Sequence, residues 1–192
     1  LHRFSICDGE VQCRKTTDDE ELCDLPPYST GCVCQGNAIS CTNIKGDKYY
    51  LFFPETLKAL VIQYSYLTLW PIQRFPIFRF GLLLNICCNS IYLLKYGAFE
   101  MVPRVRFIDI SWNNIRLLGP FVFCNLKSLK KLVCTENKIK EIVQGTFGKL
   151  ISLHMLMLEN IGLTDLTQGA FIGLDNAVTI NVSQNQIGRA HV

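Results

Sequence analysis

The chain has 192 residues, of which 49% are hydrophobic and 18% are charged. This composition supports a packed core and excludes an intrinsically disordered chain. The formal net charge of +3 is too small to indicate nucleic acid or an anionic membrane surface as a partner.

No segment of the sequence has the character of a membrane-spanning helix. Such a helix needs about 18 or more consecutive apolar residues without charges. The most apolar region, from Phe75 to Leu94, is interrupted by Arg79, Asn85 and Asn89. The chain opens at Leu1 without an initiating methionine or a signal peptide, and we expect it to be a piece of a longer protein.

Cysteines are concentrated near the amino terminus. Six of the ten lie in the first 41 residues, at Cys7, Cys13, Cys23, Cys32, Cys34 and Cys41. A dense cluster in a segment that is poor in core residues indicates disulfides formed in the secretory pathway. Structural zinc is the alternative. Zinc favours paired C-x-x-C knuckles, whereas the spacings here are C-x5-C, C-x9-C, C-x8-C, C-x-C and C-x6-C, which favours disulfides.

The first cysteines carry a family resemblance. The runs Cys7-Asp8-Gly9 and Asp19-Glu20-Glu21-Leu22-Cys23, with Cys13 between them, resemble the second half of a low-density-lipoprotein-receptor class A module. The module would cover residues 1–23. Members of that family hold one calcium ion, a hard cation that prefers about six to eight oxygen ligands.

The class A resemblance implies three calcium-binding carboxylates, at Asp8, Asp19 and Glu20. The sequence departs from the family pattern at the remaining carboxylate position, which is Gln12, and by one extra residue after Cys13. Losing a carboxylate weakens calcium binding, because an amide oxygen carries no net charge. An acidic, solvated loop held by disulfides is the alternative interpretation.

A linker over residues 24–31 leads to a second cysteine pattern, Cys32-Val-Cys34-Gln-Gly-Asn-Ala-Ile-Ser-Cys41. Its C-x-C-x6-C spacing resembles the cysteine-rich flank that opens extracellular leucine-rich-repeat proteins. We therefore expect an amino-terminal cap over residues 32–50, since the first coil of such an array needs a cover. The resemblance implies that Cys32 pairs with Cys41, and that Cys34 pairs with a cysteine upstream.

The two resemblances disagree about Cys23. The class A module would pair it with Cys7, whereas the cap would pair it with Cys34. Cys13 would pair with a cysteine that precedes Leu1. The connectivity around Cys23 therefore stays open at this point.

A period of 24 residues is the strongest pattern in the chain, and it covers residues 51–186. The template L-x-x-L-x-L-x-x-N-x-L fits six consecutive segments, with its Asn position at Ser65, Asn89, Asn113, Asn137, Ile161 and Asn185. Ten residues after the first five of these come Phe75, Phe99, Phe123, Phe147 and Phe171. The pattern is that of a leucine-rich-repeat array. It predicts an α/β solenoid, a right-handed coil with a parallel concave sheet, preceded by a small disulfide-rich module.

Each repeat position has a physical role. Alternating residues such as Leu60 and Ile62 are expected to point into the core from one short strand per turn. The Asn side chain is expected to pair with buried backbone groups in the turn, and the Phe to fill the convex side of the core. Three glycines two residues before a Phe suit a bend with unusual backbone angles: Gly97, Gly145 and Gly169.

Ser65 and Ile161 depart from the Asn pattern. The side chain of Ile161 cannot form hydrogen bonds. We therefore expect a weakened or rearranged turn there, with Asn160 shifting to compensate.

The combination of a class A module with a capped repeat array resembles the ectodomain of relaxin-family peptide receptors, which are leucine-rich-repeat G-protein-coupled receptors. That resemblance implies a seven-helix membrane domain further along the chain, a G protein as intracellular partner, and a concave sheet that binds a peptide or protein hormone. It places the parent protein in the secretory pathway and at the extracellular side of the plasma membrane. We expect residues 187–192, Ile-Gly-Arg-Ala-His-Val, to be a translated sequencing adapter rather than part of the fold.

Residues between the inward positions are expected to form columns on the concave face. The candidates for ligand binding there combine aromatic, Met and charged side chains: Phe107, Asp109, Trp112, Lys131, Met155, Met157 and Glu159. A third column is expected at Gln63, Cys87, Ser111, Thr135, Glu159 and Ser183. The alternative is that these residues cover the sheet or contact the rest of a receptor.

Other features carry less weight. Asn181-Val-Ser183 is a glycosylation sequon. Cys87-Cys88 indicates either a reactive or metal-binding pair or two idle thiols. We found no catalytic motif, and we predict that the chain is not an enzyme. The function predicted is ligand binding by a hormone receptor, and the alternative is a secreted matrix or adhesion protein.

Overall fold

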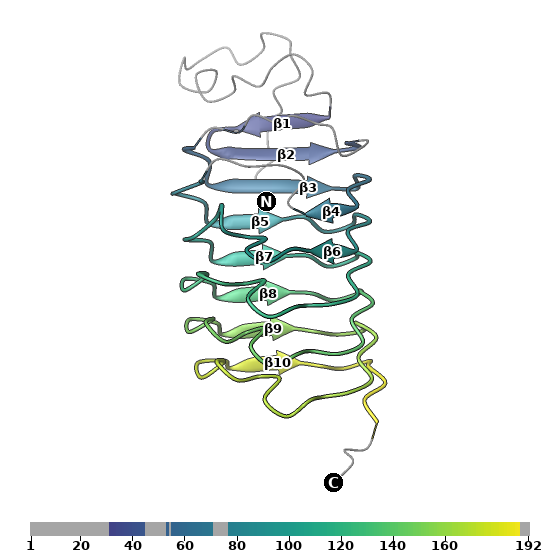
Figure 1. Ribbon diagram of the computed structural model, residues 1–192. Helices are drawn as coiled ribbons and strands as arrows, with labels where there is room; N and C mark the ends of the chain where they lie inside the picture. The colour runs from purple at the N-terminus through teal and green to yellow at the C-terminus, as the bar shows by residue number, and fades with distance from the viewer. Residues whose placement is uncertain (1–30, 45–52, 54, 71–76, 189–192) are drawn as a thin grey trace.

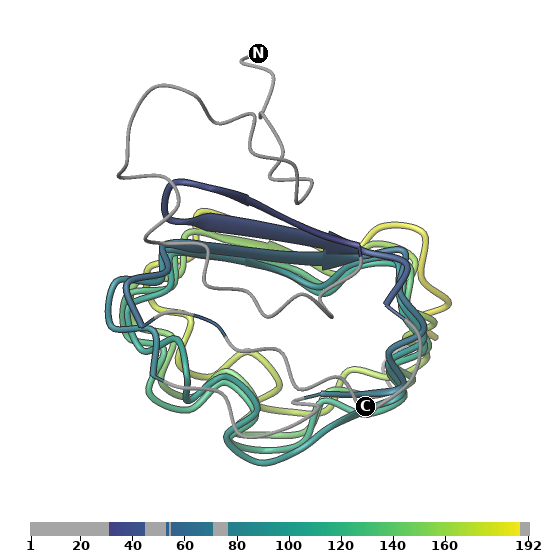
Figure 2. The same cartoon turned by 90° about the horizontal axis from the view of Figure 1, so that it is seen from above.

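Each 24-residue repeat forms one turn of a coil, and successive turns stack in register (Figures 1 and 2). The computed structural model describes residues 31–44, 53, 55–70 and 77–188. One eight-stranded sheet runs the length of the stack in the order β1-β2-β3-β5-β7-β8-β9-β10. Its strands are β1 (Cys32–Gln35), β2 (Ala38–Thr42), β3 (Ala59–Gln63), β5 (Leu83–Asn85), β7 (Phe107–Asp109), β8 (Lys131–Val133), β9 (Met155–Met157) and β10 (Thr179–Asn181).

From β2 onward all neighbouring strands of this sheet are parallel. Residues 24 apart stand side by side, so that Phe107 pairs with Lys131 and Lys131 with Met155. The predicted solenoid with a parallel sheet is therefore confirmed, and the described residues build it from strands and turns without an α-helix. The return segments on the convex side are mainly turns, together with a small parallel sheet of β4 (Leu69–Trp70) and β6 (Leu93–Leu94).

The predicted inward positions form the core. The central residues of β5, β7, β8 and β9 have no exposed surface, and Ile180 of β10 is 38% exposed. In these four repeats, the second inward residue follows directly after the strand and is equally buried: Ile86, Ile110, Cys134 and Leu158. No helix among the described residues is long and apolar enough to cross a membrane.

Phenylalanine rings form a stack beneath the convex side. The ring of Phe123 lies 5.4 Å from that of Phe99 and 6.2 Å from that of Phe147, with interplanar angles of 9° and 14°. Phe171 continues the stack at 6.4 Å from Phe147. The predicted role of these rings is confirmed, while Phe75 lies outside the described residues.

The Asn side chains form a ladder inside the turns, as predicted. In Asn137, Nδ2 donates to the carbonyl oxygens of Ile110, Cys134 and Thr135, and Oδ1 accepts from Ile115 N at 3.0 Å. Asn89, Asn113 and Asn185 donate in the same way. Asn113 Oδ1 accepts from Ile91 N, Asn89 Oδ1 accepts from Ser65 N, and Asn185 Oδ1 accepts from both Ile161 N and Leu163 N. At these four positions the ladder thus links a turn to the one before it.

The expectation that Asn160 compensates for Ile161 was wrong. Its Nδ2 donates instead to both carboxylate oxygens of Glu136, each at 3.0 Å, on the exposed side of the turn. Ile161 is fully buried. An Asn in place of Ile161 would have accepted a hydrogen bond from the Ile139 N–H, and this N–H has no acceptor in the described part of the chain. An apolar side chain replaces the polar one without changing the path of the turn.

The glycines predicted at the convex bend have left-handed backbone angles, with φ of 66° at Gly97, 86° at Gly145 and 81° at Gly169. In the repeat between Gly97 and Gly145 the equivalent residue is Phe121, with φ of 63°. Left-handed angles are unfavourable for a residue with a Cβ, so the surrounding turn imposes this conformation.

A disulfide closes the hairpin at the start of the sheet. Cys32 and Cys41 are bonded, and they face each other in the antiparallel pair β1–β2. This confirms the pairing that the cap resemblance implied. Ile39 and Ile44 beside it are buried against the first repeat, where β2 pairs with β3. The expected partner of Cys34 lies outside the described residues.

Candidate binding surface on the concave sheet

The short strands determine which side chains reach the concave surface. In β7, β8 and β9 the middle residue is buried and the two flanking residues are half-buried. Because the strands are in register and adjacent strands lie about 4.8 Å apart, the flanking residues form two rows across the sheet. The predicted outward positions on these strands are therefore confirmed.

The first row joins Phe107, Lys131 and Met155. The Lys131 ammonium lies 5.7 Å from the centre of the Phe107 ring, a distance at which a cation is attracted to the face of an aromatic ring. The row therefore presents a ring, a positive charge and a flexible thioether as one surface. Such a mixture suits a protein or peptide partner better than a small metabolite.

The second row joins Asp109, Val133 and Met157. Asp109 is partly committed to the fold, because its Oδ1 accepts hydrogen bonds from Ser111 N at 2.9 Å and Ser111 Oγ at 2.5 Å. The Oδ1 atoms of Asn85 and Asn181 likewise accept from the backbone N–H two residues further along the chain. The Asp or Asn in this column shapes the turn that ends each strand, a role that sequence reasoning missed.

Trp112 lies just beyond the second row and is 59% exposed. It belongs to a column of residues with left-handed backbone angles, one per repeat, immediately before the Asn position: Tyr64, Cys88, Trp112, Glu136, Asn160 and Gln184. The residue after each of these occupies the Asn position, inside the turn. The turn therefore directs the side chain of the left-handed residue outward. Tyr64 at 65% exposure stands in the same column.

Glu159 closes the surface on the β10 side. Its Oε1 accepts from Gln184 Nε2 at 2.6 Å, and its Oε2 accepts from Asn181 Nδ2 at 3.4 Å. The face therefore carries Lys131 between two carboxylates, those of Asp109 and Glu159. Glycosylation at Asn181 stays a prediction.

The third predicted column does not form a surface throughout. Cys87 and Ser111 in this column are 6% and 5% exposed, and the backbone N–H of each donates to the side chain of the residue that ends its strand, Asn85 or Asp109. Cys87 Sγ lies 3.3 Å from Cys88 Sγ and accepts from Gln63 Nε2 at 2.9 Å. Burial, with a smaller contribution from the hydrogen bond to Cys88, raises the pKa of Cys87 to about 12. A thiol with this pKa is not a nucleophile at neutral pH.

The buried thiol of Cys134 gives a pH-dependent stability. Burial is the larger cause that raises its pKa above the ordinary 9.0, and the charge of Asp109 is the second. The folded state therefore retains this proton more tightly than the unfolded state. The contribution of this thiol to the free energy of unfolding is fully present below pH 9. As the pH rises above 9, that contribution decreases by about 1 kcal/mol per pH unit. Urea unfolding from pH 8 to pH 10.5 measures this slope.

Cys134→Val is the matched variant for this measurement, because it retains an apolar side chain of similar size without a titrating group. The alkaline loss of unfolding free energy is expected to be shallower in the variant by the contribution of one thiol. Equal slopes in the two proteins would show that Cys134 does not titrate differently in the folded state.

Several predicted site residues lie outside the described residues: Cys7, Asp8, Cys13, Asp19, Glu20 and Cys23. Within the described ranges, no group of three or more His, Cys, Asp or Glu side chains is arranged to hold a metal ion. His154 is exposed, and its Nδ1 lies 2.7 Å from the carbonyl oxygen of Ser152.

The sequence is similar to those of known proteins with the same kind of repeat. Residues 127–187 match the family described as leucine rich repeat. Toll-like receptor 3 of Boselaphus tragocamelus is 28% identical over 114 residues, which cover 57% of this chain and 12% of the relative. Keratocan of Bos taurus is 24% identical over 191 residues, covering 96% of this chain and 51% of the relative. Leucine-rich repeat-containing G-protein coupled receptor 5 of Bos taurus is 32% identical over 79 residues, 41% of this chain and 9% of the relative. The chain thus spans about half of one relative and far less of the other two.

Proposed function

We propose that this chain, a leucine-rich-repeat protein, is the extracellular ligand-binding part of a membrane signalling receptor of the hormone-binding, G-protein-coupled kind. The observation that carries the proposal is the concave surface of Phe107, Lys131 and Met155, bordered by Trp112 and Glu159. Aromatic and Met side chains among unlike charges are typical of the centre of a protein interface. Two of the three relatives are receptors by name.

The partner that fits this surface is a peptide or small protein with both apolar and charged groups. Lys131 favours an acidic group in the ligand, and the ring and thioethers favour an apolar anchor beside it. A G protein would bind a membrane domain of the parent protein rather than this chain. The parent protein would then be at the plasma membrane, with this part outside the cell. We propose no catalytic role.

Replacing both anchors of the first row, Phe107→Ala with Met155→Ala, is expected to weaken ligand binding about 100-fold or more, because two buried contact residues together supply at least about 3 kcal/mol. Binding of a panel of synthetic peptide hormones, including relaxin-family peptides, is measured by surface plasmon resonance. Tyr96→Ala is the control, since Tyr96 is 72% exposed beyond β6 on the convex side. Equal losses in the two proteins, or binding by no peptide in the panel, would argue against a hormone site on the concave face.

A secreted matrix or adhesion protein is the second candidate. The alignment with keratocan, which covers 96% of this chain, favours it, and the relatives include secreted matrix proteoglycans as well as membrane receptors. The parent transcript distinguishes the two. Seven long apolar segments downstream support the receptor, whereas a carboxy-terminal cap followed by a stop codon supports the matrix protein.

Calcium at Asp8, Asp19 and Glu20 forms part of the receptor proposal, because it rests on the same class A resemblance. With Gln12 in place of a carboxylate, the affinity is expected to be low. Calorimetric titration of the full chain with calcium, against an Asp19→Asn variant, tests this.

A further inference from the structure

Charge is divided unevenly along the coil. Residues 77–134 contain eight Lys or Arg and only two carboxylates, Glu100 and Asp109, whereas residues 135–188 contain three Lys and five carboxylates. The small net charge of the whole chain therefore conceals a strongly basic middle section, which contains β5, β6, β7 and β8.

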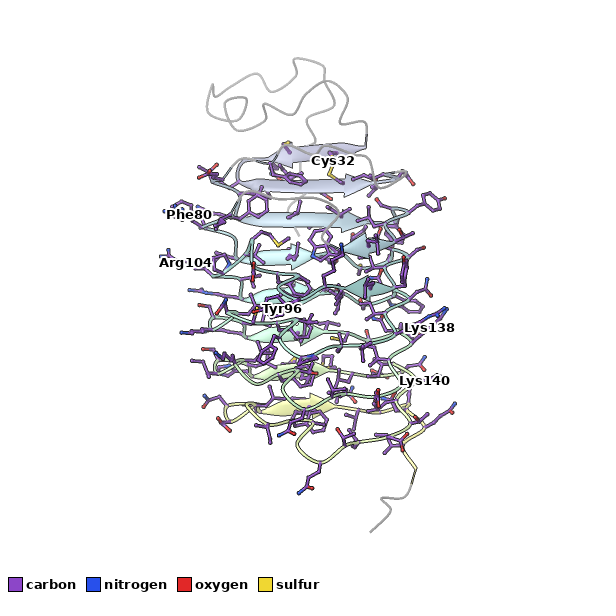
Figure 3. All side chains as sticks on the ribbon, in the orientation of Figure 1. Cys32, Phe80, Tyr96, Arg104, Lys138 and Lys140 are labelled. Carbon is purple, nitrogen blue, oxygen red and sulfur yellow. A yellow bond between two sulfur atoms is a disulfide. The ribbon has the colours of Figure 1, made fainter. Side chains whose placement is uncertain are left out.

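Five of the eight cations lie together at the edge of the sheet where the strands begin. We call this set the basic edge, and its members are Arg79, Arg104, Arg106, Lys127 and Lys130. All five are exposed, and they precede β5, β7 and β8 by one to four residues. Figure 3 shows Arg104 at this edge, opposite Lys138 and Lys140 on the other side of the coil.

The basic edge follows the stack, since Arg106 and Lys130 hold the same position on neighbouring turns, and Arg79 and Lys127 hold another position two turns apart, with Pro103 between them. The carbonyl oxygen of Arg106 accepts hydrogen bonds from Lys130 N and Lys131 N, at 2.9 and 3.0 Å, so Arg106 and Lys130 occupy equivalent places on neighbouring turns. Side chains at such places are about 4.8 Å apart at their base. The row therefore runs parallel to the axis of the stack.

In the part of the chain that the structure describes, no carboxylate neutralises these cations. None of its five cations forms an ion pair with a described residue. Glu100 belongs to the convex side, where its Oε1 lies 4.0 Å from Cys124 Sγ, and Asp109 bonds to Ser111. Unpaired like charges held in a row repel one another, and a linear polyanion relieves that repulsion while releasing its own counterions.

We propose that the basic edge is a docking surface for a sulfated polysaccharide. A linear chain of sulfates matches a row of cations along the axis, and the Arg fork binds planar or tetrahedral oxyanions through two donors. The Cys32–Cys41 disulfide indicates an oxidising, extracellular setting, in which sulfated polysaccharides rather than nucleic acids are the common linear polyanions. This surface is separate from the concave face, and it does not depend on the receptor proposal. Lys131 stands next to Lys130, so a bound polysaccharide would border the ligand surface.

Heparin is the probe, and its affinity for the full chain is measured by calorimetry at several NaCl concentrations. The variant Arg106→Gln with Lys130→Gln is expected to bind heparin at least about tenfold more weakly. The slope of log K against log [NaCl] is expected to fall by the counterion release of about two charges. The matched control, Lys138→Gln with Lys140→Gln, removes the same charge from the opposite edge, where Glu141 and Asp165 stand beside the lysines. It is expected to lose less than about threefold.

Two results would overturn the proposal. Equal weakening in both variants would mean that heparin responds only to net charge. Tighter binding of double-stranded RNA than of heparin, with the same dependence on Arg106 and Lys130, would assign the edge to nucleic acid instead. Footprinting of the unmodified chain with an amine-reactive reagent is independent of any variant's folding. Heparin is expected to protect Lys127 and Lys130 and leave Lys138 and Lys140 reactive, and the reverse pattern would also contradict the proposal.

Discussion

Phe123→Ala is expected to lower the free energy of unfolding by about 4 kcal/mol, the largest effect of any single substitution that we predict. Phe123 is 1% exposed and is stacked on both faces, with Phe99 at 5.4 Å and Phe147 at 6.2 Å. Its removal leaves a cavity in the middle of the coil and deprives two further rings of a partner. Urea unfolding followed by far-ultraviolet circular dichroism measures the loss.

The matched control is Phe171→Ala, the same change at the end of the described stack. Phe171 is only half-buried and has one ring partner, Phe147. The expected loss is therefore about half as large. If Phe123→Ala does not fold, Phe123→Leu retains most of the volume and is expected to cost about 1.5 kcal/mol. Equal losses at Phe123 and Phe171 would contradict the idea that the central ring is the main support.

The period of the sequence was sufficient to predict the coil, the sheet and the core. A solenoid repeats one set of contacts, so each residue type that recurs every 24 positions must fill the same place in each turn. The residues of β7, β8 and β9 illustrate this, because the middle one is apolar and buried in each strand. The Phe and Asn positions followed in the same way.

Departures from the period were harder to predict, because they depend on contacts between turns. Ile161 was expected to disturb its turn, yet the amide of Asn185 in the following repeat accepts the Ile161 and Leu163 N–H groups at 3.1 and 3.0 Å. Asn160 is free to bond to Glu136 instead. The next Asn of the ladder thus holds the turn in place, although the Ile139 N–H stays without an acceptor among the described residues, and no pattern within one repeat shows this.

The limits of the short strands also could not be predicted from the alternation of residues. Alternation placed Cys87 and Ser111 on the concave surface, but each strand has ended two residues before. Past that point the Asn85 or Asp109 side chain accepts from the backbone N–H of Cys87 or Ser111, and both of these residues are buried. Turn geometry, rather than hydrophobic period, decides which residues reach the surface there.

The candidate ligand surface consists of the positions that the repeat leaves unconstrained. At the first outward position the chain has Leu83, Phe107, Lys131, Met155 and Thr179 on five successive strands, whereas the residue after each of these is always Leu or Ile. Packing restricts the inward residue and not the outward one. Variation at outward positions can therefore encode a binding preference without altering the fold.

Asn113→Ala is expected to lower the free energy of unfolding by about 3 kcal/mol. Asn113 is 6% exposed. Its Nδ2 donates to three carbonyl oxygens, two of which, those of Ile86 and Ile110, also accept from the neighbouring ladder residues Asn89 and Asn137.

The Ile91 N–H, by contrast, loses its acceptor, because among the described residues it donates only to Asn113 Oδ1, at 3.0 Å. Most of the expected cost thus comes from one buried amide left without a partner. Hydrogen exchange of the Ile91 amide is expected to accelerate more than that of Ile115, which keeps its bond to Asn137 Oδ1 at 3.0 Å. In the unmodified chain, Ile139 is expected to exchange faster than Ile115 for the same reason, since Ile161 offers it no acceptor.

Asn160→Ala is the control for this prediction. Asn160 is exposed, and among the described residues its side-chain amide bonds only to the Glu136 carboxylate. The expected loss is therefore below about 1 kcal/mol. A similar loss at Asn113 and Asn160 would mean that the ladder amides are satisfied by water once the side chain is removed. A large loss at Asn113 with unchanged exchange at Ile91 would place the cost in the carbonyl bonds instead, and would contradict the assignment to the single N–H group.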